Sequence, residues 1–81
     1  MKFEEFQKKL GARIRYLRRN QDITQGQLCK MLGLESPSYI CEIEKGKRNP
    51  SMETLYEMEK ILGPIWSVAH LQNIKGNIVI P

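Results

Sequence analysis

One short run of residues, Lys45-Gly46-Lys47-Arg48-Asn49-Pro50, contains the side chains best suited to chemistry with an anion. Lysine and arginine present charged N–H donors to phosphate oxygens, and an asparagine amide adds a neutral donor. The run has no large apolar side chain that would draw it into a core. Its composition therefore predicts an exposed loop that binds phosphate.

Residue types that support catalysis or metal binding do not occur at useful spacings. Glu42 and Glu44 lie two residues apart on a predicted helix, so they face different directions and cannot act as a catalytic carboxylate pair. Cys29, Cys41 and His70 lack the spacing of a metal site. No nucleophile–base arrangement and no glycine-rich phosphate loop is present. The sequence predicts a protein that is not an enzyme and has no metal and no cofactor.

Two short helices are predicted immediately before the basic loop. The first begins after Thr24, a good N-capping residue, and ends before Gly33, which suits left-handed backbone. The second begins after Ser36, has Pro37 in its first turn, where a missing N–H costs nothing, and ends at Gly46. Two short helices joined by a glycine turn and followed by a basic loop are typical of a helix-turn-helix, whose second helix enters the DNA major groove.

Amphipathic segments flank this pair of helices. Apolar residues recur at three- and four-residue steps from about residue 3 to 20, which indicates a helix with one buried face. Its apolar positions are Phe3, Phe6, Leu10, Ile14 and Leu17. A further helix is predicted from Ser51 to the stop at Gly63-Pro64. The predicted fold is mainly α, a compact four- to five-helix bundle over residues 1–63 that contains the helix-turn-helix.

The segment 64–81 differs in composition from the bundle. Residues 65–71 fit a short helix or a strand, and residues 66–72 could pair with 77–80 as a β-hairpin. A two-stranded hairpin is marginal alone, so we expect this tail to bind another surface and to provide a dimer contact. The residues expected in that contact are Trp66, Val68, Ile78, Val79 and Ile80. The alternative is that these residues cover the core of their own chain.

Length and charge limit the remaining possibilities. The chain has 81 residues, enough for one small domain, and a net charge of +4. The excess of positive charge lies in residues 1–22, which carry seven Lys and Arg against three Asp and Glu. No stretch approaches the ~20 apolar residues that span a bilayer, and the N-terminus lacks an apolar signal region. With two cysteines and no disulfide framework, these features favour a cytoplasmic protein with no membrane partner.

The chain resembles the lambda-repressor-like (Cro/Xre-type) helix-turn-helix family from about Leu10 to Gly63. The residues that carry the resemblance are Arg13-Ile14-Arg15-x-Leu17-Arg18, Thr24-Gln25-x-x-Leu28, Leu32-Gly33, Tyr39-Ile40-x-x-Ile43-Glu44-x-Gly46-x-Arg48-x-Pro50-Ser51 and Thr54-Leu55. The resemblance implies a transcriptional regulator, with repression the expected activity, that binds a two-fold operator in double-stranded DNA, commonly as a homodimer.

The resemblance also implies roles for individual residues. Arg18 and Glu44 match a salt bridge that links the first helix to the end of the third. The matching base-contacting positions are Gln25, Pro37, Ser38 and Glu42. The matching phosphate-contacting positions are Thr24, Gln25, Tyr39, Lys45, Lys47, Arg48 and Asn49. Because the base-facing set lacks the Arg or Lys that usually reads guanine, we expect low intrinsic selectivity.

This weak base-reading set leaves a second interpretation open. In it the bundle is kept, the tail binds a partner protein such as a toxin, and DNA binding is secondary. The protein would then be an antitoxin-like interaction module.

Overall fold

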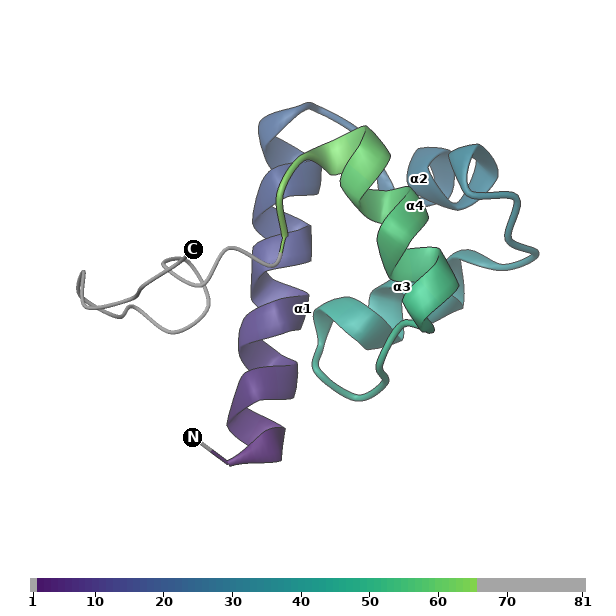
Figure 1. Cartoon of the computed structure of the whole chain (residues 1–81). Helices are drawn as coiled ribbons and strands as arrows, with labels where there is room; N and C mark the ends of the chain where they lie inside the picture. Colours follow the sequence, from purple (N-terminus) through teal and green to yellow (C-terminus); the bar gives the residue numbers. More distant parts are fainter. Residues whose placement is uncertain (1, 66–81) are drawn as a thin grey trace.

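The computed structural model describes residues 2–65, which form four helices (Figure 1). α1 spans Phe3–Asn20, α2 Gln25–Met31, α3 Pro37–Glu44 and α4 Met52–Leu62. The long α1 lies along one side of the molecule, and the three shorter helices gather on its other side (Figure 1). The predicted mainly α bundle is confirmed. The predicted strand or hairpin and the five expected dimer residues lie outside the described part of the chain.

The three short helices begin at side-chain caps. The Thr24 hydroxyl accepts a hydrogen bond from the Gln27 N–H at 3.0 Å, and the Gln27 side-chain carbonyl oxygen accepts from the Thr24 N–H at 2.8 Å. The hydroxyls of Ser36 and Ser51 accept from backbone N–H groups in the first turns of α3 and α4. Each cap satisfies a donor that the helix itself leaves unpaired, which is worth about 1 kcal/mol. The caps predicted from sequence therefore fix where α2, α3 and α4 start.

Glycines shape the turns on either side of α3. Gly33, in the turn after α2, has φ of 71°, and Gly46, after α3, has φ of 77°. L-residues with a Cβ rarely adopt this left-handed backbone, so glycine suits both positions. The two turns direct the chain into α3 and then into the basic loop.

The core lies where all four helices meet. Its members are at most 4% exposed: Leu10, Ile14, Leu28, Cys29, Ile40, Ile43, Leu55, Met58, Leu62 and Ile65. Phe3, expected on the buried face of α1, is instead 61% exposed, because the first turn of α1 extends beyond the core. Periodicity identifies the buried face of a helix but not where along the helix burial begins.

The chain leaving α4 is fastened to the bundle. Ile65 is fully buried, and its N–H donates to Oε2 of Glu59 at 3.0 Å. The Arg13 guanidinium of α1 donates to the Pro64 carbonyl at 3.2 Å. Figure 1 shows this segment running back beside α1. The packed core thus includes residues just beyond α4.

A close approach of α1 and α3 depends on Gly11. A Cβ placed on Gly11 would lie 2.1 Å from the Ile43 carbonyl oxygen and 3.0 Å from that of Glu44. These distances are shorter than van der Waals contact, so only glycine lets the two helices approach to this extent. This contact fixes the C-terminal end of α3 against α1.

Candidate DNA interface

One face of α3 is free of the bundle. Ile40, Ile43 and Glu44 are buried on its inner side. Ser38 is exposed and Glu42, one turn further on, is partly exposed. Residues four apart share a helix face, so these two side chains form an outward stripe that continues into Lys45. This stripe is the part of α3 that can enter a groove.

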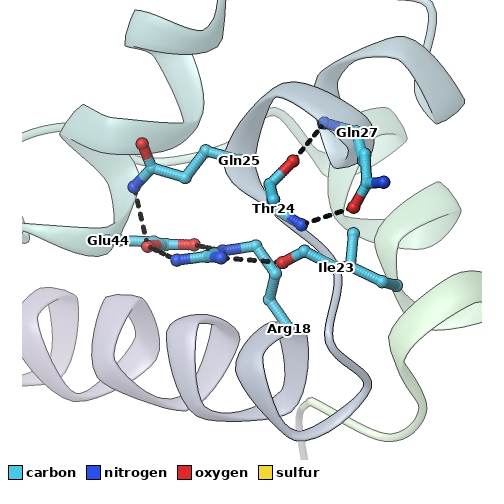
Figure 2. A network of polar contacts seen from close by, with 6 residues as sticks. All are labelled: Arg18, Ile23, Thr24, Gln25, Gln27 and Glu44. Atoms are coloured by element: carbon cyan, nitrogen blue, oxygen red, sulfur yellow. Dashed lines mark hydrogen bonds and ion pairs between the residues drawn. The ribbon is translucent and has the colours of Figure 1, made fainter.

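A buried ion pair holds α3 in place (Figure 2). Arg18 Nε and Nη2 donate to the two oxygens of Glu44 at 2.6 and 2.9 Å, and the two side chains are only 8% and 3% exposed. Arg18 Nη1 donates in addition to the Ile23 carbonyl at 2.8 Å. Hydrogen bonding to Glu44 raises the pKa of the Arg18 guanidinium above its ordinary value. The paired, fork-shaped contact joins α1, the turn before α2 and the end of α3.

Gln25 belongs to the same network. Its Nε2 donates to Glu44 Oε1 at 3.0 Å, so its side chain is turned toward the ion pair rather than held out in solvent (Figure 2). The N-terminus of α2 is thereby tied to the C-terminus of α3. This contact, with the Arg18 pair, sets the position of α2 relative to α3, on which the reading geometry of a helix-turn-helix depends.

Four of the residues expected at phosphate form an exposed surface after α3. This surface is made of Lys45, Lys47, Arg48 and Asn49, all of which are exposed. Lys45 and Lys47 flank Gly46, and Asn49 precedes Pro50. Thr24 is expected at phosphate too, but it uses its hydroxyl and its N–H in the capping of α2. The basic loop and the start of α2 both adjoin α3, one after its C-terminal end and the other through the Gln25 contact.

Arg48 differs from the lysines of this loop. Its Nη1 donates to Glu42 Oε1 at 3.1 Å, and its guanidinium carbon lies 4.7 Å from the centre of the Tyr39 ring. The half-buried Tyr39 is in turn fixed by its hydroxyl, which accepts from the Ser51 N–H at 3.3 Å. Sequence reasoning treats Arg48 and Glu42 as separate contacts and misses this pair. The only sequence signal for this pair is that an acidic residue in α3 is followed, a few residues after the helix ends, by a basic one.

A basic surface on α1 adjoins the same region. Arg15 and Arg19 are exposed and border a shallow groove that also includes Glu44. Near the other end of the helix, Lys8 packs directly against Gly46 of the basic loop. Both arginines lie on the side of α1 opposite its buried residues Leu10 and Ile14. Their position beside α3 follows from the packing of α1 and was not predicted.

Comparison with known proteins supports the interpretation of this geometry. A family model described as helix-turn-helix matches residues 14–65. The chain belongs to the helix-turn-helix family. The match includes all of α2, α3 and α4, and the resemblance inferred from the sequence motifs is thereby confirmed.

Two relatives and one solved structure are similar to this helix-turn-helix chain. An uncharacterized HTH-type transcriptional regulator, y4dJ, of Sinorhizobium fredii is 34% identical over 84% of this chain and 82% of the relative. The immunity repressor protein of Bacillus phage phi105 is 39% identical over 67% of this chain, but only 37% of the repressor is matched. The restriction-modification controller protein C.AhdI from Aeromonas hydrophila superposes with a TM-score of 0.63 at 33% identity, over 68% of this chain and 82% of the controller.

Metal clusters and membrane spans are both absent from the described part of this helix-turn-helix protein. Residues 2–65 hold no group of three or more His, Cys, Asp or Glu that could bind a metal ion. Within the same range, no helix combines the length and the apolar character needed to cross a membrane.

Proposed function

We propose that this protein is a DNA-binding regulator of transcription that inserts α3 into the major groove of an operator. The main support is the outward stripe of α3, with an exposed basic loop directly after the C-terminal end of the helix and the N-terminus of α2 hydrogen-bonded to Glu44 at that same end. The names of the similar proteins, a transcriptional regulator, an immunity repressor and a controller protein, support the same class. Repression is the expected activity and the cytoplasm the expected location. A catalytic role is not part of the proposal.

Cations around α3 would supply most of the affinity. We assign phosphate contacts to Lys45, Lys47 and Asn49 in the loop, with Thr24 and Tyr39 on the two flanks. Each phosphate neutralised releases counterions, so the logarithm of the binding constant should fall with the logarithm of salt concentration by about 0.9 per contact. Arg48 is also expected to contact DNA, but it differs from the lysines because it is paired with Glu42.

Base reading would come from the outward stripe of α3 and its neighbours. Ser38 and Glu42 lie on that stripe, Pro37 lies beside it in the first turn, and Gln25 stands at the start of α2. Serine contacts bases with little selectivity and proline cannot donate a hydrogen bond. DNA shape at steps that are not contacted would then add to the specificity.

We infer that the protein acts as a homodimer joined through residues 66–81. A two-fold operator requires two reader helices about 34–36 Å apart, one in each half-site. The apolar residues Trp66, Val68, Ile78, Val79 and Ile80 supply the expected contact. The antitoxin-like interpretation would instead assign this tail to a different protein.

Selection of binding sites by the full-length protein tests the function. Random double-stranded DNA is enriched by repeated capture, and affinities for the enriched duplex and a scrambled duplex are then measured by fluorescence anisotropy at about 50 to 200 mM salt. We expect a two-fold consensus, tighter binding to it than to the scrambled duplex, and steep weakening of both with salt. Failure to enrich any sequence, with no salt-dependent binding, would refute the proposal. Salt-dependent binding without a consensus would favour the interaction-module alternative.

A further inference from the structure

Two kinds of cation follow α3, and they differ in whether neighbouring side chains hold them. Lys45 and Lys47 make no hydrogen bond or ion pair through their side chains within residues 2–65. Arg48, in contrast, is held at 3.1 Å by the Glu42 carboxylate and lies 4.7 Å from the centre of the Tyr39 ring. A lysine without such contacts suits a phosphate, which accepts hydrogen bonds in many geometries. A guanidinium held on two sides suits a target with fixed geometry.

The platform under Arg48 is part of the fold. Tyr39 is half-buried, and its hydroxyl accepts from the N–H of Ser51, the residue that caps α4. The ring is therefore fixed at both ends, by α3 and by the start of α4. A guanidinium that stacks on such a ring gains a cation–π attraction and loses rotational freedom before DNA is bound.

The position of Glu42 places the Arg48 guanidinium on the reading side of α3. Glu42 lies one turn after Ser38 on the outward stripe. Although Arg48 belongs to the loop, its side chain reaches back along α3 and ends beside the second turn of the helix. When α3 lies in the major groove, this location is beside base edges and not only at the groove rim.

The chemistry of the pair favours a base over a phosphate. Arg48 and Glu42 together carry no net charge, so the pair gains little from neutralising a phosphate. Of the three nitrogens in the Arg48 guanidinium, only Nη1 has a hydrogen-bond partner within residues 2–65. The other two, Nε and Nη2, remain available as donors. Two neighbouring N–H donors in a planar fork match the O6 and N7 acceptors of guanine.

We propose that Arg48 reads a guanine in the major groove and that Glu42 and Tyr39 are positioning residues that orient its guanidinium. This assignment rests on the proposed function, because it requires α3 to lie in the major groove. It replaces the phosphate role that loop composition predicted for Arg48 and the direct base contact that was expected of Glu42. It also supplies the guanine reader that the base-facing positions of α3 lack.

The test measures base preference position by position. The full-length wild type is titrated with its selected duplex and with a series in which each G·C pair is replaced singly by A·T. We expect one G·C pair in each half-site whose replacement weakens wild-type binding by roughly 5- to 150-fold. Arg48→Ala and Arg48→Lys should both abolish the preference at that pair and keep it at the others. Lysine keeps the charge but not the fork, so its failure separates base reading from phosphate binding.

Two further variants distinguish positioning from direct contact. Glu42→Gln should reduce the preference at the same G·C pair and make the salt dependence steeper, because it frees the guanidinium charge. In an Arg48→Ala background, the same substitution should have no further effect at that pair. Lys47→Ala is the matched control in the loop, and it should lower the salt slope by about 0.9 and leave every base preference unchanged.

The outcomes separate failure of this inference from failure of the proposed function. Arg48 and Glu42 are 53% and 47% exposed in their side chains, so their variants should melt at nearly the wild-type temperature. If Arg48→Ala weakens binding to all duplexes equally and lowers the salt slope, Arg48 contacts phosphate and the inference is wrong, although DNA binding stands. The inference is also wrong if no G·C preference depends on Arg48. If the wild type binds no duplex at all, the proposed function itself fails.

Discussion

Both carboxylate oxygens of Glu44 accept hydrogen bonds from side chains of two other helices. Arg18 of α1 supplies donors to both oxygens, and Gln25 of α2 supplies a further donor to Oε1. An amide at position 44 would remove the charge and point N–H groups at these donors. Because the site is buried, the Arg18 guanidinium would then remain in the interior as an unpaired charge, which destabilises the fold.

We therefore expect Glu44→Gln to lower the free energy of unfolding by roughly 3–5 kcal/mol, which is the usual cost of breaking a buried pair. Thermal unfolding followed by circular dichroism measures this. Glu57→Gln is the matched control, because Glu57 pairs with Lys60 at 3.6 Å on the exposed surface of α4 and should contribute little. If Glu44→Gln melts within error of the wild type, the pair does not stabilise the fold.

Titration of Arg18 should contribute little to the pH dependence of the free energy of unfolding near neutral pH. Its pKa is raised above the ordinary arginine value by the Glu44 hydrogen bond. A group with a raised pKa stabilises the fold fully at every pH below its unfolded value and loses that contribution only as pH rises through the folded value. For an arginine, that window lies above the pH range used in binding experiments.

A substitution of Lys47 tests whether the basic loop contacts phosphate. Lys47→Ala should weaken binding to selected and scrambled duplexes by the same factor and lower the salt slope by about 0.9, because a phosphate contact carries no sequence information. Fluorescence anisotropy at several salt concentrations measures both quantities. Lys60→Ala, an exposed lysine on α4, should leave the slope unchanged. A changed consensus with an unchanged slope would contradict the assignment.

Among the elements, the packing of α1 against α3 is the most sensitive to a single methyl group. Gly11→Ala would put a Cβ 2.1 Å from the Ile43 carbonyl oxygen, and α3 would have to move away from α1. We expect a loss of roughly 1–3 kcal/mol despite the better helix propensity of alanine. Gly26→Ala is the control on α2, since its nearest contact would be the Thr24 hydroxyl at 3.9 Å.

Urea denaturation distinguishes these two glycine variants. Gly26→Ala should raise the midpoint, because alanine is favoured by about 0.5–1 kcal/mol in a helix where nothing crowds it. Gly11→Ala should lower the midpoint. A higher midpoint for Gly11→Ala would mean that α1 and α3 can separate at no cost.

The helices were predictable because their signals are local. Thr24, Ser36 and Ser51 cap the helices that the sequence assigned to them, and Gly33 has the left-handed backbone expected after α2. These features depend on neighbours within a few residues and on the spacing of apolar side chains. The same reasoning could not give the exposure of Phe3, which depends on where the core ends.

Side-chain pairings between elements were harder to predict. The family resemblance assigns Gln25 to DNA, and only the packed structure shows that its amide donates to Glu44. The contact of Arg48 with Glu42 depends on the path of the loop after Gly46. Such contacts are determined by how helices pack, which residue types and spacing alone do not specify. The motif match did identify Arg18 and Glu44, because it carries packing information from related chains.

For the whole molecule, the main structural prediction concerns what residues 66–81 contribute. Ile65 is fully buried and hydrogen-bonded to Glu59, so a chain ending at residue 65 keeps the described core, whereas one ending at Gly63 would lose part of it. We expect the chain 1–65 to remain helical, to sediment as a monomer, and to lose cooperative binding to a two-fold operator. The full-length chain should sediment as a dimer.

Sedimentation equilibrium of both chains, with circular dichroism as a check on folding, measures this. The physical reason is that Trp66 and the β-branched residues 78–80 are among the large apolar residues of the tail, and burial between two copies would remove their surface from water. A dimer that persists in the chain 1–65 would place the interface within the described bundle. A full-length monomer would mean that the tail does not join two copies of the chain.

The division of α3 into an inner and an outer face has a consequence for how such a regulator can diversify. The inner face, with Ile40, Ile43 and Glu44, maintains the fold. Ser38 and Glu42 on the outer face make no core contact. A duplicated copy of the gene could therefore change these two positions and Arg48 with little loss of stability. New operator preferences would arise in a few substitutions, and two copies in one cell could soon control different genes without cross-talk.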